Sequence, residues 1–166
     1  MAKLNLTFYG DEVLRKKTRY VKVFDKRLIK LIQDMFQTMY EENGIGLAAP
    51  QVGVLKKIIV VDTQHEGEIY AMVNPKILQF SEETETMNEG CLSIPGVEGD
   101  VTRAKSIRVR FNDPETGEEK ELEATDLLAR VIQHETDHLN GVLFVDHLSE
   151  KDRANQARKL EELAIA

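Results

Sequence analysis

Residues 126–141 read DLLARVIQHETDHLNG, and the segment HETDH within them places His134 and His138 four positions apart. On an α-helix, residues four apart lie on one face, so both imidazoles can bind one metal ion. Glu135 follows His134 directly and can move the protons of a water held at that metal. The alternative is a solvated helix face that carries two unrelated histidines. The spacing favours a metal site with its own acid/base.

The same stretch predicts a buried helix at the centre of the fold. Its apolar side is formed by Leu127, Leu128, Val131, Ile132 and Leu139. His134 and His138 continue the face of Leu127 and Val131 at helical steps of four, three and four. The helix is expected to begin at Thr125 or Asp126 and to end at Asn140-Gly141. A buried helix would hold the imidazoles in a dry, shaped site.

The rest of the chain predicts strands around this helix, with one helix before them and one after. A helical stripe of apolar residues covers 25–43, with Asp25 as its N-cap and Gly44 at its end. Strands are predicted at 55–62, 68–74, 75–85 and 107–111 and, after a turn at 112–117, up to residue 124. A last helix follows a capping box of Ser149 and Asp152. We predict an α+β fold in one domain, residues 1–166, with mostly antiparallel strands surrounding the HExxH helix.

A catalytic metal site needs a third protein ligand and one position left open for water. Cys91 is the only cysteine of the chain, so it cannot form an internal disulfide and is a candidate ligand, nucleophile or core residue. It lies in EGCLSIP, residues 89–95, a loop-like stretch punctuated by glycine and proline. Asp146, His147 and Glu150 follow the motif and are the alternative third ligands, as in peptidases.

A third segment, GIGLAAPQVG at residues 44–53, predicts a tight turn of small residues after the first helix. Its glycines permit close approach of the backbone, and Gln51 supplies its only side-chain amide. No GK[ST] follows, so the segment is not a phosphate-binding loop. Taken alone, it predicts a packing loop with a glutamine at the surface.

Together the three segments resemble the signature motifs of the peptide deformylase family. GIGLAAPQ at 44–51, EGCLS at 89–93 and QHETDH at 133–138 match these motifs in order and spacing. The resemblance covers nearly the whole chain and includes a C-terminal helix of the bacterial type.

The resemblance implies a role for each residue of the site. Three residues would bind the metal: Cys91, His134 and His138. Three would line the pocket and the strand-like cleft for the first residue of the substrate: Ile45, Gly46 and Glu89. Glu135 would be the general base and acid. Gln51 and the backbone N–H of Leu92 would donate hydrogen bonds to the carbonyl oxygen of the substrate.

The family removes the formyl group from N-formylmethionyl peptides as they emerge from the ribosome, and it releases formate. The resemblance implies ferrous iron as the metal in cells, with zinc, nickel or cobalt able to occupy the site. A soft thiolate ligand tolerates ferrous iron but exposes it to oxidation. The resemblance also implies ribosome docking through the last helix, which carries four cations: Lys151, Arg153, Arg158 and Lys159.

Composition argues against several other classes of protein. A formal net charge of −7 does not suit an electrostatic nucleic-acid binder. No apolar run approaches the ~18 residues needed to cross a bilayer, so no membrane partner is expected. The first thirty residues hold no secretory signal, and a single cysteine suits a reducing compartment. The expected location is the cytoplasm.

Two other functions stay open at this point. An HExxH metallopeptidase with a downstream third ligand would cleave internal peptide bonds, and a binding module with a structural metal would use a fourth protein ligand. Two positions also depart from the family pattern. Glu98 stands where relatives often have arginine, which leaves the peptide preference beyond the first residue open. Arg130 stands where others have an apolar side chain, and it is expected to fold outward or rim the pocket.

Overall fold

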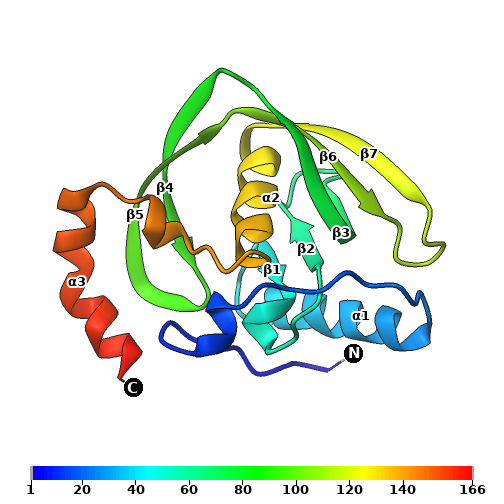
Figure 1. Ribbon diagram of the computed structural model, residues 1–166, viewed down its shortest axis with the longest axis horizontal. Coiled ribbons are helices and arrows are strands. Elements are labelled where there is room, and N and C mark those ends of the chain that lie inside the picture. The colour runs from blue at the N-terminus through cyan, green and yellow to red at the C-terminus, as the bar shows by residue number, and fades with distance from the viewer. Residues whose placement is uncertain (1, 166) are drawn as a thin grey trace.

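The structure is a computed structural model that describes residues 2–165. Helix α2 (Asp126–His138) lies near the middle of the molecule, between two antiparallel sheets (Figure 1). The larger sheet has five strands in the order β1-β2-β3-β6-β7, and β4 and β5 form the smaller sheet. The predicted α+β fold, with mostly antiparallel strands around the HExxH helix, is confirmed.

The helices and strands follow one another in a simple order. The strands are β1 (Gly46–Ala48), β2 (Ile58–Asp62), β3 (Ile69–Phe80), β4 (Thr84–Cys91), β5 (Ile94–Ala104), β6 (Ser106–Asn112) and β7 (Glu119–Thr125). Helix α1 (Lys26–Glu41) precedes them and α3 (Glu150–Ala164) ends the chain, with 3-10 turns at Glu12–Arg15, Ala49–Val52 and Phe144–His147. Helix α3 packs along the outer side of β5 (Figure 1).

The helices begin where the sequence predicts. The side chains of Asp25 and Ser149 each accept a backbone N–H from the first turn of α1 and α3, respectively. Each cap satisfies an N–H that the helix itself leaves free. Thr125 is the N-cap of α2. At the end of α1, Asn43 adopts the left-handed backbone, with φ of 59°, so the glycine expected to end the helix follows one residue later.

Strand β3 corrects a predicted boundary. The chain forms one strand, Ile69–Phe80, where the sequence predicts two. Pro75 has no N–H to give to a strand ladder and usually interrupts one. Here the pairing with β6 shifts register between Val73 and Lys76, and Asn74 takes a φ of 52°. This bulge accommodates the proline inside a long strand.

Apolar side chains hold α2 in place on its sheet side. Leu128, Ala129, Val131 and Ile132 join a buried cluster with residues of the five-stranded sheet. The side toward β4 carries polar groups that are also buried: His134 is 8% exposed, Glu135 4% and His138 1%. Burying such groups is costly unless they are paired or bind a ligand. The helix therefore places these three ionisable side chains in the interior, on its side toward β4.

Candidate active site

A cavity of about 490 Å³ opens between α2, β4 and the segment that follows α1. Eight residues predicted for the site line it: Ile45, Gly46, Gln51, Glu89, Cys91, Leu92, His134 and Glu135. The ninth, His138, is buried and does not line the cavity itself, but it contacts Cys91, which does. The structure therefore brings together segments that are distant in the sequence.

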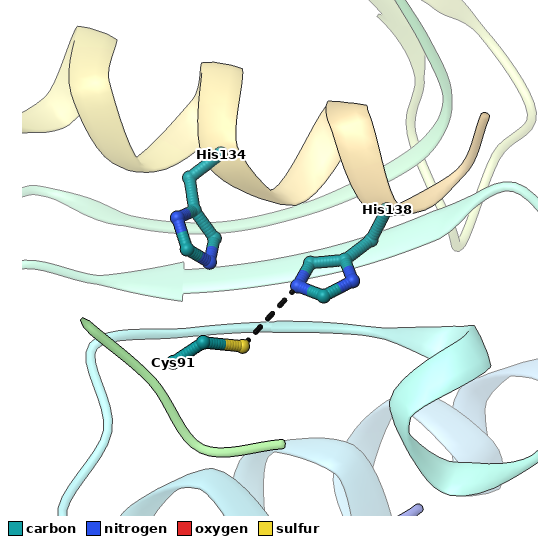
Figure 2. Close-up of side chains that lie close together, drawn as sticks. All are labelled: Cys91, His134 and His138. Atoms are coloured by element: carbon teal, nitrogen blue, oxygen red, sulfur yellow. Dashed lines mark hydrogen bonds between the residues drawn. The ribbon is translucent and has the colours of Figure 1, made fainter. Parts of the chain in front are cut away.

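A sulfur atom and two imidazoles meet at the inner end of this cavity. Both imidazoles point from α2 toward Cys91, whose Sγ lies 3.4 Å from Nε2 of His138 (Figure 2). One ligand atom each of Cys91, His134 and His138 lies within 4.8 Å of the other two. This spacing suits three donors around one ion at bond lengths of about 2.0–2.3 Å. Within residues 2–165, no other group of histidine, cysteine and carboxylate side chains meets the same criterion.

The downstream residues that could have replaced Cys91 have other partners. Asp146 accepts a hydrogen bond from Arg15 at 2.6 Å, and His147 bonds to Asp137 at 2.9 Å. Glu150 is exposed in the first turn of α3. The geometry thus favours Cys91 as the third ligand.

Strand β4, and not a loop, carries Cys91. The sequence predicts a loop-like stretch at 89–95, but the chain forms the end of β4, a tight turn at Leu92-Ser93 and the start of β5. The pairing shifts register between Gly90 and Cys91. Such bulges re-aim side chains and are frequent beside active sites. Cys91 thereby stands on a paired strand, which is more rigid than a free loop.

Glu89 holds the first histidine in one orientation. Its Oε1 lies 2.8 Å from Nδ1 of His134, and it accepts further hydrogen bonds from Arg103 at 2.6 and 3.0 Å and from Arg130. Burial raises the pKa of Glu89, but the hydrogen bonds from His134 and Arg103 outweigh burial and lower it to about 2. An ionised carboxylate keeps a proton on Nδ1, so the lone pair of Nε2 is left for a cation. No spacing in the sequence predicts this role of Glu89.

The pKa values of the two imidazoles are shifted in opposite directions. Burial lowers the pKa of His134, but Glu135, Cys91 and Glu89 outweigh it and raise the pKa well above its usual value. Burial and the nearby positive charge of His134 lower the pKa of His138 well below its usual value. Only a neutral imidazole binds a metal, so the lowered pKa of His138 favours binding, whereas His134 must release a proton from Nε2 when a metal binds.

Gln51 is buried and points into the site. Its Oε1 accepts the backbone N–H of Ala48 at 2.9 Å, while Nε2 donates to Ser93 Oγ at 3.1 Å and to Cys91 Sγ at 3.4 Å. The segment that carries it forms β1 and a 3-10 turn rather than a simple loop. The expectation of a surface glutamine is therefore wrong. The amide instead presents its N–H groups beside the sulfur.

Glu135 lies next to the histidines and against the backbone of β1. Its Oε2 is 4.0 Å from Nε2 of His134, and its buried Oε1 has no hydrogen-bond partner within residues 2–165. Burial raises the pKa of Glu135 to about 7. A Cβ at Gly46 would lie 2.6 Å from Oε2 of Glu135 and 2.7 Å from Cγ1 of Val131. Only glycine permits this approach.

The two positions that depart from the family pattern differ in environment. Arg130 is buried and lines the cavity, so the expectation that it folds outward is wrong and the expectation that it rims the pocket is confirmed. Glu98 is exposed on β5, opposite Gly90 of β4.

The sequence matches the family model described as polypeptide deformylase over residues 3–154. The chain belongs to the polypeptide deformylase family. Peptide deformylase 1 of Clostridium acetobutylicum is 53% identical over 152 residues, which cover 92% of this chain and 99% of the relative. Peptide deformylase of Brachyspira hyodysenteriae is 42% identical over 164 residues, covering 95% of this chain and 87% of the relative.

Solved structures of peptide deformylases share the fold. A crystal structure of peptide deformylase from Plasmodium falciparum superposes with a TM-score of 0.91 at 37% identity, covering 96% of this chain and 94% of that one. For the Synechococcus elongatus enzyme in complex with actinonin, the TM-score is 0.85 at 45% identity, covering 98% of this chain and 85% of that one.

Membership of this family establishes the kind of reaction. A peptide deformylase is a metal-dependent hydrolase that removes the formyl group from the N-terminal methionine of newly made polypeptides, so the predicted activity is confirmed. The Cys/His group at the cavity agrees with metal dependence. The deformylase activity accounts for the chain better than an HExxH metallopeptidase does.

The close contact at Gly46 yields a prediction. We expect Gly46→Ala to lower kcat by about 10- to 100-fold, because the methyl group must displace the Glu135 carboxylate, and a shift of about 1 Å can cost about 10²-fold. Formate release by the metal-loaded variant is the measurement. Gly53→Ala is the control, since Gly53 has a φ of 80° but no atom within 4 Å of its Cβ position. That control should lose stability while keeping its turnover, and a Gly46→Ala variant with wild-type turnover would contradict the prediction.

Proposed function

We propose that deformylation takes place at a metal held by Cys91, His134 and His138, with Glu135 as the acid/base. One observation carries this proposal: a sulfur and two imidazoles converge at the inner end of a cavity beside a buried carboxylate. Three protein ligands leave a position for water, as a catalytic site requires. When bound, the metal acidifies water and polarises the formyl carbonyl.

We propose ferrous iron as the metal in cells, with zinc, nickel or cobalt in purified samples. A thiolate is a soft ligand, and imidazoles suit iron, nickel and zinc alike. The ligand set alone does not select among these ions, so availability and exposure to oxygen decide the occupant. Elemental analysis of protein prepared without oxygen tests this assignment.

The proposed proton transfers use one carboxylate twice. Glu135 accepts a proton as water attacks the formyl carbon, and it returns that proton to the nitrogen when the C–N bond breaks. The products are formate and a free amine. A pKa near 7 leaves both the acid and the base form of Glu135 accessible at neutral pH. The buried Oε1 has no hydrogen-bond partner within residues 2–165, so it can accept a hydrogen bond from water in the site.

Gln51 and the backbone N–H of Leu92 are the proposed donors to the oxyanion that forms on the carbonyl oxygen. The bond from Ala48 to Oε1 of Gln51 supports this role, because it directs the NH₂ end of the amide toward Cys91. Leu92 follows Cys91 at the turn between β4 and β5 and lines the same cavity. Removal of one such donor typically lowers turnover by about 10²–10³.

The substrate is proposed to bind as an extended strand with its methionine side chain in the cavity. Strand β1 is an edge of the larger sheet and β4 belongs to the two-stranded sheet, so the chain offers strand edges on both sides of the cleft. Ile45 and Gly46 lie at the first edge and Glu89 at the second. The apolar lining includes Leu127 and Val131, which suits a thioether side chain.

We propose that the chain acts in the cytoplasm on peptides at the ribosome, as a single catalytic domain. The structure has no helix, within residues 2–165, that is long and apolar enough to span a membrane. Helix α3 carries exposed cations, among them Lys151 and Lys159. Replacing both with glutamate should reduce co-sedimentation with ribosomes without reducing formate release from a short peptide. Unchanged co-sedimentation would exclude α3 as the docking element.

The proposed function is tested by formate release from formyl-Met-Ala-Ser, with protein prepared without oxygen and its metal measured. We expect formate and Met-Ala-Ser as the only products. Acetyl-Met-Ala-Ser is the control, because its extra methyl group enlarges the acyl group at the same position. Cleavage of an internal peptide bond, or no formate from metal-loaded protein, would refute the proposed function.

A further inference from the structure

Arg130 makes an unusual set of contacts for a residue that lines a substrate cavity. Its side chain is only 7% exposed. Nη1 donates to Oε2 of Glu89 at 2.5 Å and to the carbonyl oxygen of Val101 at 2.9 Å, and Nη2 donates to the carbonyl oxygen of Glu85 at 2.6 Å. The guanidinium is therefore engaged with protein atoms on both sides.

These acceptors join three elements. Arg130 belongs to α2, Glu85 and Glu89 to β4, and Val101 to β5. Two of the three acceptors are backbone carbonyls, which cannot turn away as a side chain can. The guanidinium, which has a planar and rigid set of donors, thus fixes the distance between the helix and the smaller sheet.

The proposed metal ligands come from two of these elements. Cys91 stands at the end of β4, and both histidines stand on α2. Arg130, His134 and His138 are four apart, so they share one face of α2. Along β4, Glu89 contacts the first two of these side chains, and Cys91 contacts the last. Arg130 therefore joins α2 to β4 one helical turn before the ligand His134.

We propose that Arg130 is a positioning residue that fixes β4 against α2, and thereby holds Cys91 within bonding range of both histidines before a metal binds. This inference rests on the proposed function, because it takes Cys91, His134 and His138 as the ligands. A preformed site binds metal tightly because the ligands lose little freedom on binding. Arg130 acts on metal retention and makes no bond to the metal itself.

Arg103 also donates to Glu89, but unlike Arg130 its other hydrogen bond goes to a side chain. That bond joins Arg103 to Asp137 at 2.9 Å, and the Asp137 carboxylate also bonds to His147 at the surface. In the absence of Arg130, Arg103 and His134 still partner the Glu89 carboxylate. Removing Arg130 therefore leaves no uncompensated buried charge, and the variant is expected to fold.

The test uses the full chain loaded with Co²⁺ and measures the rate at which EDTA removes the ion, with no peptide present. We expect Arg130→Met to release Co²⁺ about 10- to 100-fold faster than the wild type, in the range known for residues that orient metal ligands. Arg130→Lys should also release it faster, since one ammonium cannot span three acceptors. Arg108→Met is the matched control, because Arg108 is exposed on β6 and 3.6 Å from Glu123.

A second measurement separates positioning from a general structural role. Co²⁺ raises Tm by binding the folded state only. Positioning by Arg130 predicts that this rise shrinks in Arg130→Met, whereas a merely structural role lowers the Tm of metal-free and loaded protein equally. Equal lowering, or a release rate matching that of the Arg108→Met control, would overturn the proposal. If Arg130→Met fails to fold, the same two readouts on Arg130→Lys decide.

Other outcomes identify which assignment has failed. A raised KM with wild-type Co²⁺ release would make Arg130 a substrate contact, and this overturns the positioning role alone. If Cys91→Ala retains Co²⁺ as the wild type does, the ligand assignment itself fails and the Arg130 proposal fails with it. The two failures are thus distinguishable in one set of proteins.

Discussion

Cys91→Ala is expected to lose most of its metal and to lower deformylase turnover by at least about 10³-fold. The substitution leaves two imidazoles, which are too few to hold a divalent ion tightly, and without the ion no acidified water forms at neutral pH. Elemental analysis and formate release from formyl-Met-Ala-Ser measure the two effects. Cys91 is one residue from the β4–β5 turn and only part-buried, so the fold should survive the change.

Asp146→Ala is the informative control for this prediction. Asp146 is the kind of downstream carboxylate that an HExxH peptidase could use, but here it pairs with Arg15. We expect this variant to keep its metal and its activity, with some loss of stability. If Asp146→Ala lost its metal and Cys91→Ala kept it, the third ligand would be Asp146 and not Cys91.

Glu135→Gln is expected to keep its metal and to lower turnover by about 10²–10⁴, the range typical of a general acid/base. The amide has nearly the same shape as the carboxylate but cannot accept and return a proton. Because Gly46 packs closely against this side chain, an isosteric change should leave the surroundings in place. The measurement is kcat together with metal content, and a circular dichroism spectrum reports on the fold.

A surface glutamate supplies the control for this variant. Glu121 is exposed on β7, so Glu121→Gln changes the same charge without touching the cavity. Its turnover should match the wild type. If the turnover of Glu135→Gln were within a few-fold of this control, Glu135 could not be the acid/base. A binding module with a structural metal would show that result, because it does not use Glu135 for proton transfer.

The sequence was sufficient for the features that depend on local spacing. HETDH predicts the ligand face of α2 because helical geometry alone places His134 beside His138. Asp25 and Ser149 predict helix starts because capping is a contact within one turn. The prediction that Cys91 is the third ligand rests on the resemblance of three ordered motifs to one family, and no single motif supports it alone.

Features that depend on distant pairing were less predictable. Residues 89–95 contain glycine and proline, which locally indicate a loop, but they pair as β4 and β5 around a turn without an Asn-Gly signal. For Arg130 the sequence predicts an outward or rim position, whereas the side chain is buried and paired. Its partner Glu89 lies 41 positions earlier, and no periodicity in the sequence connects the two. The acidic residue close to Cys91 was the one available signal.

Helix α2 supplies both imidazoles, Glu135 and Arg130, and nine of its 13 residues are buried. Selection for a stable protein and selection for turnover therefore act on the same side chains, which leaves this helix little freedom to drift. Three other residues that line the cavity are not under both kinds of selection: Asn43, Met87 and Asn88. Substitutions that confer resistance to an inhibitor should therefore arise among these three residues. Serial passage with the inhibitor that selected substitutions in α2 would contradict this expectation.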